Sequence, residues 1–341
     1  MSATAGHKSV VCFGEMLLRL SPHSGTPLTR ADALALHAGG AEANVAIALA
    51  GLGQSARMVT ALPDNALGRR ARAALGEAGV DTAHCMNGEG RLGLYFFEPP
   101  TGPIGGRVSY DRAASAFVNA SPDDFDWSAI LDGAGLLHLS GITPALGPSG
   151  VALARAAIAA AREHDVPICF DGNYRSNLWE AWDVDPREIL TELVSEATIL
   201  IGNHRDISLL LGHEFSGEGP DRRREAAAAA FSAFGKLQTI ASTARHVDSA
   251  TAQRLASRID LRESHWQTEE VRIDPVIDRI GTGDAFAAGA LMRWLEGGSA
   301  QDMAKTGLSL AVMKHGIVGD NLSVSRAELD AFDPAGADVR R

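Results

Sequence analysis

The segment that decides the fold is DRIGTGDAFAAGALMRWLEGG, which runs from Asp278 to Gly298. Gly281 and Gly283 flank Thr282, and an alanine-rich stretch of helical composition follows Asp284. Glycines allow successive backbone N–H groups to point into one concavity, and a helix start adds unpaired donors and the positive end of a dipole. The segment therefore predicts an anion hole that opens into a helix.

A carboxylate stands directly beside this predicted anion hole, at Asp284. Phosphoryl transfer needs mainly positioning and charge stabilisation, and a carboxylate that orients the acceptor hydroxyl and accepts its proton late is sufficient. An aspartate near a helix start is also a favoured N-cap. The two preceding glycines and the basic Arg279 upstream favour the catalytic interpretation over the cap.

Short runs rich in Val, Ile and Leu alternate with alanine-rich helical segments over most of the chain before this segment. This alternation is typical of βαβ units and a mostly parallel sheet, so the expected fold class is α/β. Strands are expected at 10–13, 58–61, 136–140, 167–171, 198–202 and 239–242, and helices at 43–52, 66–78, 150–163, 186–197, 204–211 and 222–234.

Two regions, 16–37 and 92–117, break the βαβ rhythm and show period-two alternation instead. We expect them to form a small β-sheet that projects from the main sheet as a lid. The expected organisation is a single domain over 1–334 that carries this lid, followed by a C-terminal tail at 335–341. Exposed strand edges often pair with a second copy, so a homodimer through the lid is a further hypothesis.

Composition limits the classes of partner. The 341 residues are 45% hydrophobic and 21% charged, and 31 basic against 42 acidic residues give a formal charge of −11. This balance predicts a globular protein and argues against nucleic-acid or membrane-surface binding. Cys12, Cys85 and Cys169 are few and widely spaced, and no signal sequence or long apolar segment is evident, so we expect a cytoplasmic protein with reduced thiols.

Two motifs, in the expected order and at the expected distance, resemble the signatures of the ribokinase-like (PfkB) sugar kinases. DRIGTGDAFAAG resembles the C-terminal signature, and GGAEANVA at 39–46 resembles the N-terminal one. The resemblance implies a three-layer α/β/α sandwich, ATP and Mg²⁺ as cofactors, and a monovalent cation as a further candidate. It makes Asp284 the catalytic base, lets the amides of Gly281, Thr282 and Gly283 stabilise the phosphoryl group, and places the sugar near Gly39, Gly40 and Asn44.

Asp171, Asn173 and Arg175 alternate in FDGNYRSNLW, which follows an expected strand. Ligands of open parallel sheets bind beyond the carboxyl ends of strands, so these side chains are well sited for the sugar. The segment resembles the DxNxR stretch of 2-keto-3-deoxygluconate kinases, in which the arginine meets the substrate carboxylate. A planar guanidinium suits a carboxylate bidentately, although a surface salt bridge is the alternative for Arg175.

Tyr95, Tyr110 and Arg112 lie in the expected lid and are similar to lid residues that contact the keto acid in those kinases; packing within the lid is their alternative. An acidic protein that aims two arginines at one sugar pocket is more easily explained by an anionic sugar acid than by a neutral sugar. The predicted reaction is therefore ATP-dependent phosphorylation of 2-keto-3-deoxygluconate to its 6-phosphate, with a fructokinase or another neutral-sugar kinase as the alternative.

The nucleotide side departs from the family pattern. Family members usually carry NxxE where this chain has Asn203 and Asp206, which remain candidates for holding magnesium and its waters. The usual glycine-rich turn is replaced by IASTARHV, so we expect a Thr/Arg-rich phosphate contact. The candidate nucleotide contacts are Asn203, Ser242, Thr243, Arg245, Arg279, Gly281, Gly283 and Asp320.

Two other stretches of the sequence mimic known motifs without their context. GLGQSA at 51–56 mimics a dinucleotide fingerprint but follows a helix rather than a strand, and no P-loop sequence occurs. The string His204-Arg205-Asp206 lacks the asparagine that a protein-kinase catalytic loop needs five residues later, because Leu211 stands there. A catalytically silent sugar- or nucleotide-binding regulator stays the non-enzyme alternative, and retention of Asp284 argues against it.

Overall fold

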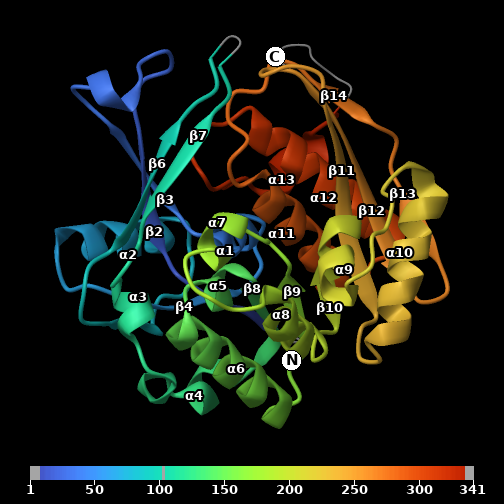
Figure 1. Cartoon of the computed structure of the whole chain (residues 1–341), viewed down its shortest axis with the longest axis horizontal. Coiled ribbons are helices and arrows are strands. Elements are labelled where there is room, and N and C mark those ends of the chain that lie inside the picture. Colours follow the sequence, from blue (N-terminus) through green and yellow to red (C-terminus); the bar gives the residue numbers. More distant parts are fainter. Residues whose placement is uncertain (1–7, 102–103, 335–341) are drawn as a thin grey trace, which may run out of the picture.

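A computed structural model describes residues 8–101 and 104–334, and its centre is a ten-stranded, mostly parallel sheet (Figure 1). The strand order is β13-β12-β11-β10-β9-β8-β1-β4-β5, and β14 also pairs with β12. The strands are β1 Ser9–Phe13, β4 Ala56–Leu62, β5 Cys85–Asn87, β8 Ala134–Ser140, β9 Ile168–Asp171, β10 Ile199–Ile201, β11 Thr239–Val247, β12 Gln253–Leu261, β13 His265–Gln267 and β14 Val271–Ile273.

Alternate residues of the central strands feed two separate cores, one on each face of the sheet. Val10 and Cys12 of β1 belong to one core, and Val11 and Phe13 to the other. Helices cover both faces because both faces are apolar, as parallel sheets require. The first core includes residues of α1 Ala41–Gly51, α2 Ala66–Glu77, α11 Thr282–Leu295, α12 Ala300–His315 and α13 Arg326–Ala331.

The second core includes residues of the remaining helices, so the expected three-layer α/β/α sandwich is confirmed. Among the helices, the long α6 Pro148–Glu163 and the helices α8 to α10 supply most of the side chains of this core. These helices are α3 Ala116–Asn119, α4 Trp127–Leu131, α5 Ile142–Ala145, α6, α7 Ser176–Trp179, α8 Pro186–Val194, α9 His204–Leu211 and α10 Gly219–Ala233. None of the helices in the described ranges is long and apolar enough to cross a membrane.

A second, four-stranded sheet projects beyond the main sheet, at the upper left of Figure 1. Its order is β3-β2-β6-β7, with β2 and β6 parallel and both outer pairs antiparallel. The two regions that interrupt the βαβ rhythm supply these strands, which confirms the expected small sheet; we call it the lid. Its strands are β2 Leu17–Ser21, β3 Ala35–Gly39, β6 Gly93–Glu98 and β7 Arg107–Asp111, and the short 3-10 helices lie at Leu28–Arg30 and Pro122–Asp124.

One expected strand end was wrong. The strand expected at 239–242 is too short, because β11 continues to Val247 and pairs antiparallel with β12 along its whole length. The chain lacks the glycine that a sharp turn would need here, and a neighbouring strand satisfies the backbone groups instead. As a consequence, Ser242, Thr243 and Arg245 stand on an extended strand beside the cleft described below.

Candidate active site

A cleft of about 1140 Å³ opens at the carboxyl ends of β9 and β10, between the main sheet and the lid. This is the edge of an open parallel sheet at which ligands bind. The lining contains every site residue predicted from the sequence except Gly39, which is buried at the end of β3. Segments more than 200 residues apart in sequence therefore meet around one cavity, as the Asn44–Asp284 hydrogen bond shows by joining positions separated by 240 residues.

Asp284 lies in the first turn of α11 and does not cap it. The N-cap is Gly281, with a φ of 79°, and no side chain caps the helix. A Cβ at Gly281 would stand 1.6 Å from the carbonyl oxygen of Asp320, so only glycine fits this position. The first-turn N–H groups have no acceptor within an α-helix, and they lie beside the Asp284 carboxylate at the cleft.

Opposing effects act on the pKa of the Asp284 carboxyl group. Burial raises its pKa to about 6, while a hydrogen bond from Asn44 Nδ2, at 2.6 Å, and the charge of Arg175 act in the other direction. Asn44 projects from α1, whose N-cap Gly40 has a φ of 134° and approaches the Glu15 backbone closely. Asn44 thus contacts the predicted base directly, and its Oδ1 has no protein partner among the described residues.

Two further carboxyl groups, those of Asp171 and Glu42, interact electrostatically with Asp284. Burial raises the pKa of Asp171 well above its usual value, and the charges of Asp284 and Asp206 act in the same direction. Glu42 is fully buried, and burial together with Asp284 raises its pKa to about 7. This crowding of acids is the electrostatic environment in which an incoming cation is stabilised.

Arg175 is the counter-charge of this acidic group. It follows β9 and is exposed, and within residues 8–101 and 104–334 its guanidinium donates only to the carbonyl oxygen of Tyr174, at 3.1 Å. The surface salt bridge that was its alternative is absent among the described residues. Asn173 has a φ of 39°, a left-handed conformation that is uncommon for a residue other than glycine and that turns the chain at the cleft.

The lid contributes an ordered group of aromatic and charged side chains. The rings of Tyr95 and Tyr110 lie 6.1 Å apart, and the Arg112 guanidinium stands 5.7 Å from the Tyr110 ring centre. Arg112 donates through Nε to Glu15 Oε2 at 2.7 Å, and this ion pair is buried. Glu15 lies two residues after the end of β1, so the pair joins the lid to the main sheet.

Asn203 and Asp206 form the capping box of α9. The Asn203 side chain accepts from Arg205 N, and Asp206 Oδ2 accepts from Asn203 N at 2.8 Å. Burial raises the pKa of Asp206. The second carboxylate oxygen of Asp206 is not engaged by the capping box, and magnesium takes few protein carboxylates together with water and phosphate oxygens, so the donor set fits this ion. No cluster of three or more metal-ligating side chains occurs in the described residues.

Three arginines, Arg205, Arg245 and Arg279, line the cleft without an ion-pair partner in the described part of the chain. The pKa of Arg245 is lowered by burial and by the charges of the other two, so the three guanidinium groups lie near one another. Mutually repelling arginines at a cleft indicate an anionic ligand such as a polyphosphate. Ser242 and Thr243 lie on the same stretch of β11.

Asp320 lies in the loop between α12 and α13 and lines the cleft. Its carboxylate accepts from Arg19 Nη1 at 3.1 Å and from the Tyr95 hydroxyl, and its side chain is almost fully buried. The sequence placed it among the nucleotide contacts, whereas its hydrogen-bond partners are residues of the lid.

Sequence reasoning missed Glu15, Glu42 and Arg205. Glu15 follows a buried parallel strand, which is the same signal that pointed to Asp171, and Glu42 stands inside the N-terminal signature. Arg205 lies inside the string that mimics a protein-kinase catalytic loop, which hides its own signal. Its place in the first turn of a helix that follows β10 could have identified it.

The fold and this cleft define a class of protein: a phosphotransferase, with an anion hole, a carboxylate beside it and arginines for a polyphosphate. The chain belongs to the pfkB family of carbohydrate kinases, whose family model matches residues 7–325. The expected enzyme class, a sugar kinase, is thereby confirmed.

Individual relatives extend over nearly the whole chain. A 2-dehydro-3-deoxygalactonokinase of Haloferax volcanii is 32% identical over 321 residues, covering 94% of this chain and 95% of the relative. The crystal structure of a 2-dehydro-3-deoxygluconokinase from Thermotoga maritima superposes with a TM-score of 0.90 at 34% identity, covering 95% and 99% of the two chains. A fructokinase from Xylella fastidiosa with bound ATP shares the fold, with a TM-score of 0.77 at 20% identity.

Proposed function

We propose that this kinase transfers the γ-phosphoryl group of ATP to the 6-hydroxyl of 2-keto-3-deoxygluconate. The observation that carries the substrate is Arg175, a cation at the carboxyl end of β9 whose guanidinium has no carboxylate partner among the described residues. A planar fork at this place suits the carboxylate of a sugar acid. The two relatives named for 2-keto-3-deoxy sugar acids support the same substrate class.

In this proposal the acceptor hydroxyl lies between the anion hole and Asp284. Asp284 orients the hydroxyl and takes its proton as the bond to phosphorus forms. The first-turn amides of α11 stabilise the charge on the transferred group, because they point outward without partners of their own. Arg205, Arg245 and Arg279 bind the nucleotide phosphates with Ser242 and Thr243, and Tyr95, Tyr110 and Arg112 cover the sugar from the lid.

Magnesium is the expected cofactor, held by Asp206 with Asn203 close by. When bound, the ion neutralises phosphate charge, and the excess of carboxyl groups around Asp171 supports its place there. We propose a magnesium-dependent reaction, with a monovalent cation as a further candidate cofactor.

We further propose that residues 1–334 work as one kinase domain in the cytoplasm, where ATP is available, and that two copies associate through the lid. The tail at 335–341 lies outside the described residues.

The test is ATP consumption with magnesium against a panel of 2-keto-3-deoxygluconate, its galactonate epimer, fructose and ribose. Asp284→Asn is the blank, and the expected result is selective turnover of a keto acid that the blank lacks. Turnover of fructose or ribose alone would overturn the substrate and keep the kinase. An Asp284→Asn enzyme with normal turnover would remove Asp284 as the base.

A further inference from the structure

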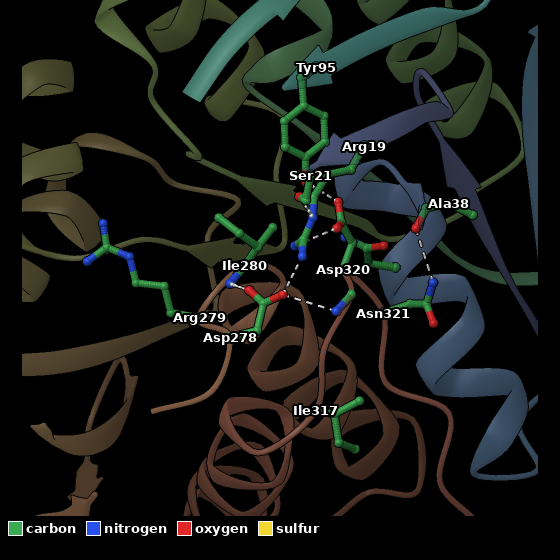
Figure 2. A network of polar contacts seen from close by, with 12 residues as sticks. Arg19, Ser21, Ala38, Tyr95, Asp278, Arg279, Ile280, Ile317, Asp320 and Asn321 are labelled. Carbon is green, nitrogen blue, oxygen red and sulfur yellow. Dashed lines mark hydrogen bonds and ion pairs between the residues drawn. The ribbon is translucent and has the colours of Figure 1, made fainter. Parts of the chain in front are cut away.

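A buried network of charged residues joins the lid to the loop in front of the anion hole (Figure 2). At its centre lies Arg19 of β2, whose side chain is 1% exposed. The Arg19 guanidinium donates to Asp278 Oδ2 at 2.6 Å and to Asp320 Oδ1 at 3.1 Å, and its Nε donates to Ser21 Oγ at 2.9 Å. One cation thus holds two buried carboxylates from distant segments.

Asp278 organises the loop that carries the anion hole. Its Oδ1 accepts from Ile280 N and its Oδ2 from Gly319 N, both at 3.0 Å. Ile280 directly precedes Gly281, the N-cap of α11. The direction of the anion-hole backbone is therefore set by a carboxylate that is itself bound to the lid through Arg19.

Asp320 makes the corresponding contact with the sugar side. Its carboxylate accepts from the hydroxyl of Tyr95, a lid residue that lines the cleft. A Cβ at Gly39 would stand 2.2 Å from Asp320 Oδ2, and a Cβ at Gly281 would stand 1.6 Å from its carbonyl oxygen. Asp320 is thus packed between a glycine of the N-terminal signature and a glycine of the anion hole.

Burying charged groups costs desolvation free energy, so a gain in stability does not by itself explain this network. Well-packed apolar residues often stabilise a protein as well as a buried ion pair does, whereas buried charges fix one geometry. Here the network fixes the position of the lid relative to the loop that carries the anion hole, and both line one cleft. In Figure 2 the Arg279 side chain points away from the network. The Asp278 carboxylate is therefore used within the network, while the side chain of the next residue, Arg279, stays available to a ligand.

We propose that Arg19, Asp278 and Asp320 are positioning residues through which the lid sets the anion hole. The lid and the loop at 278–284 then move as one cooperative unit, and loss of the Tyr95 hydroxyl loosens a loop with which it shares no direct hydrogen bond in the described structure. This proposal rests on the proposed function only in assigning phosphoryl binding to the loop.

The first experiment needs no substrate. Hydrogen exchange of the Ile280 and Ala285 amides is compared in the wild-type protein, Tyr95→Phe and Tyr110→Phe. Tyr110 is a matched control because it is a lid tyrosine without a hydrogen bond to Asp320. Loss of one buried hydrogen bond predicts about five-fold faster exchange at both amides in Tyr95→Phe and none in the control. Equal exchange in all three proteins would overturn the proposal.

The second experiment separates positioning from sugar contact. In a double-mutant cycle of Tyr95→Phe and Asp278→Asn, a shared network predicts that the combined loss of kcat differs about three-fold or more from the product of the single losses. An additive result, or an effect of Tyr95→Phe on KM alone, would reduce Tyr95 to a substrate contact. If the wild-type enzyme turns over no sugar, the proposed function fails, and the exchange experiment still decides the network.

Discussion

At the scale of single residues, the burial of Asp284 makes activity sensitive to acid. A base must be ionised to accept a proton, and burial raises the pKa of Asp284 to about 6. We therefore expect kcat/KM to fall with a one-proton slope below about pH 6, since this ratio reports the free enzyme. Asn44→Leu removes the hydrogen bond that lowers this pKa and should move the acid limb to higher pH.

The control for this profile is Asn87→Ala, at the exposed end of β5. Its acid limb should coincide with that of the wild type. A wild-type kcat/KM that stays level from pH 7 down to pH 5 would contradict the assignment of Asp284 as the ionising base.

Glu42 gives a prediction on stability. Its pKa rises from 4.5 to about 7 on folding, so the folded chain keeps a proton that the unfolded chain releases between these values. The free energy of unfolding therefore falls as pH rises through this window. Glu42→Gln should remove that fall and gain up to roughly 3 kcal/mol at pH 8, with little gain at pH 4.

Urea unfolding at the two pH values measures this difference. Glu77→Gln, at the end of α2 with a largely exposed side chain, is the matched control and should follow the wild type at both. A gain of equal size at pH 4 and pH 8 would show that Glu42 acts through packing and not through its charge.

At the scale of elements, the capping box of α9 lets the role of Asp206 in metal binding be tested apart from its role in helix stability. Asp206→Asn keeps an oxygen for the Asn203 amide but removes the negative charge that we assign to magnesium. We expect the magnesium concentration for half-maximal rate to rise about ten-fold or more, since substitution of a metal ligand, or of a residue that orients one, typically costs that much in metal affinity. The melting temperature should change little.

The chain offers a close control in α12, whose capping box pairs Ser299 with the exposed Asp302. Asp302→Asn makes the same chemical change at a helix start away from the cleft. An unchanged magnesium titration in Asp206→Asn would leave Asp206 as a cap alone.

The elements also show what the sequence could and could not predict. The βαβ rhythm placed the core strands and helices because buried parallel strands read as apolar runs, and two glycines before Asp284 marked the anion hole. The continuation of β11 to Val247 was not predictable from its polar residues, since pairing with β12 supplies the stabilisation. Glu15 and Arg112 lie 97 positions apart, and only the fold brings them together.

At the scale of the whole molecule, one face of the lid is apolar and is partly open. By strand register, Leu20 of β2 lies opposite Leu36 of β3 and Phe96 of β6 on the same face, while Arg19 and Tyr95 point to the other. Leu36 is 38% exposed. An apolar sheet face with free edge strands is a surface that a second copy can cover, so we expect a dimer through the lid.

Light scattering at micromolar concentration tests this association. Leu36→Glu places a charge on the apolar face, at its edge strand β3, and should convert a dimer of the wild-type chain to a monomer, because an unpaired charge buried at an interface costs several kcal/mol. Val247→Glu places the same charge at another exposed apolar residue, at the end of β11 outside the lid, and should leave the mass unchanged. A monomeric wild-type chain would mean that this lid closes over the sugar without a partner, and that its apolar outer face serves no association at these concentrations.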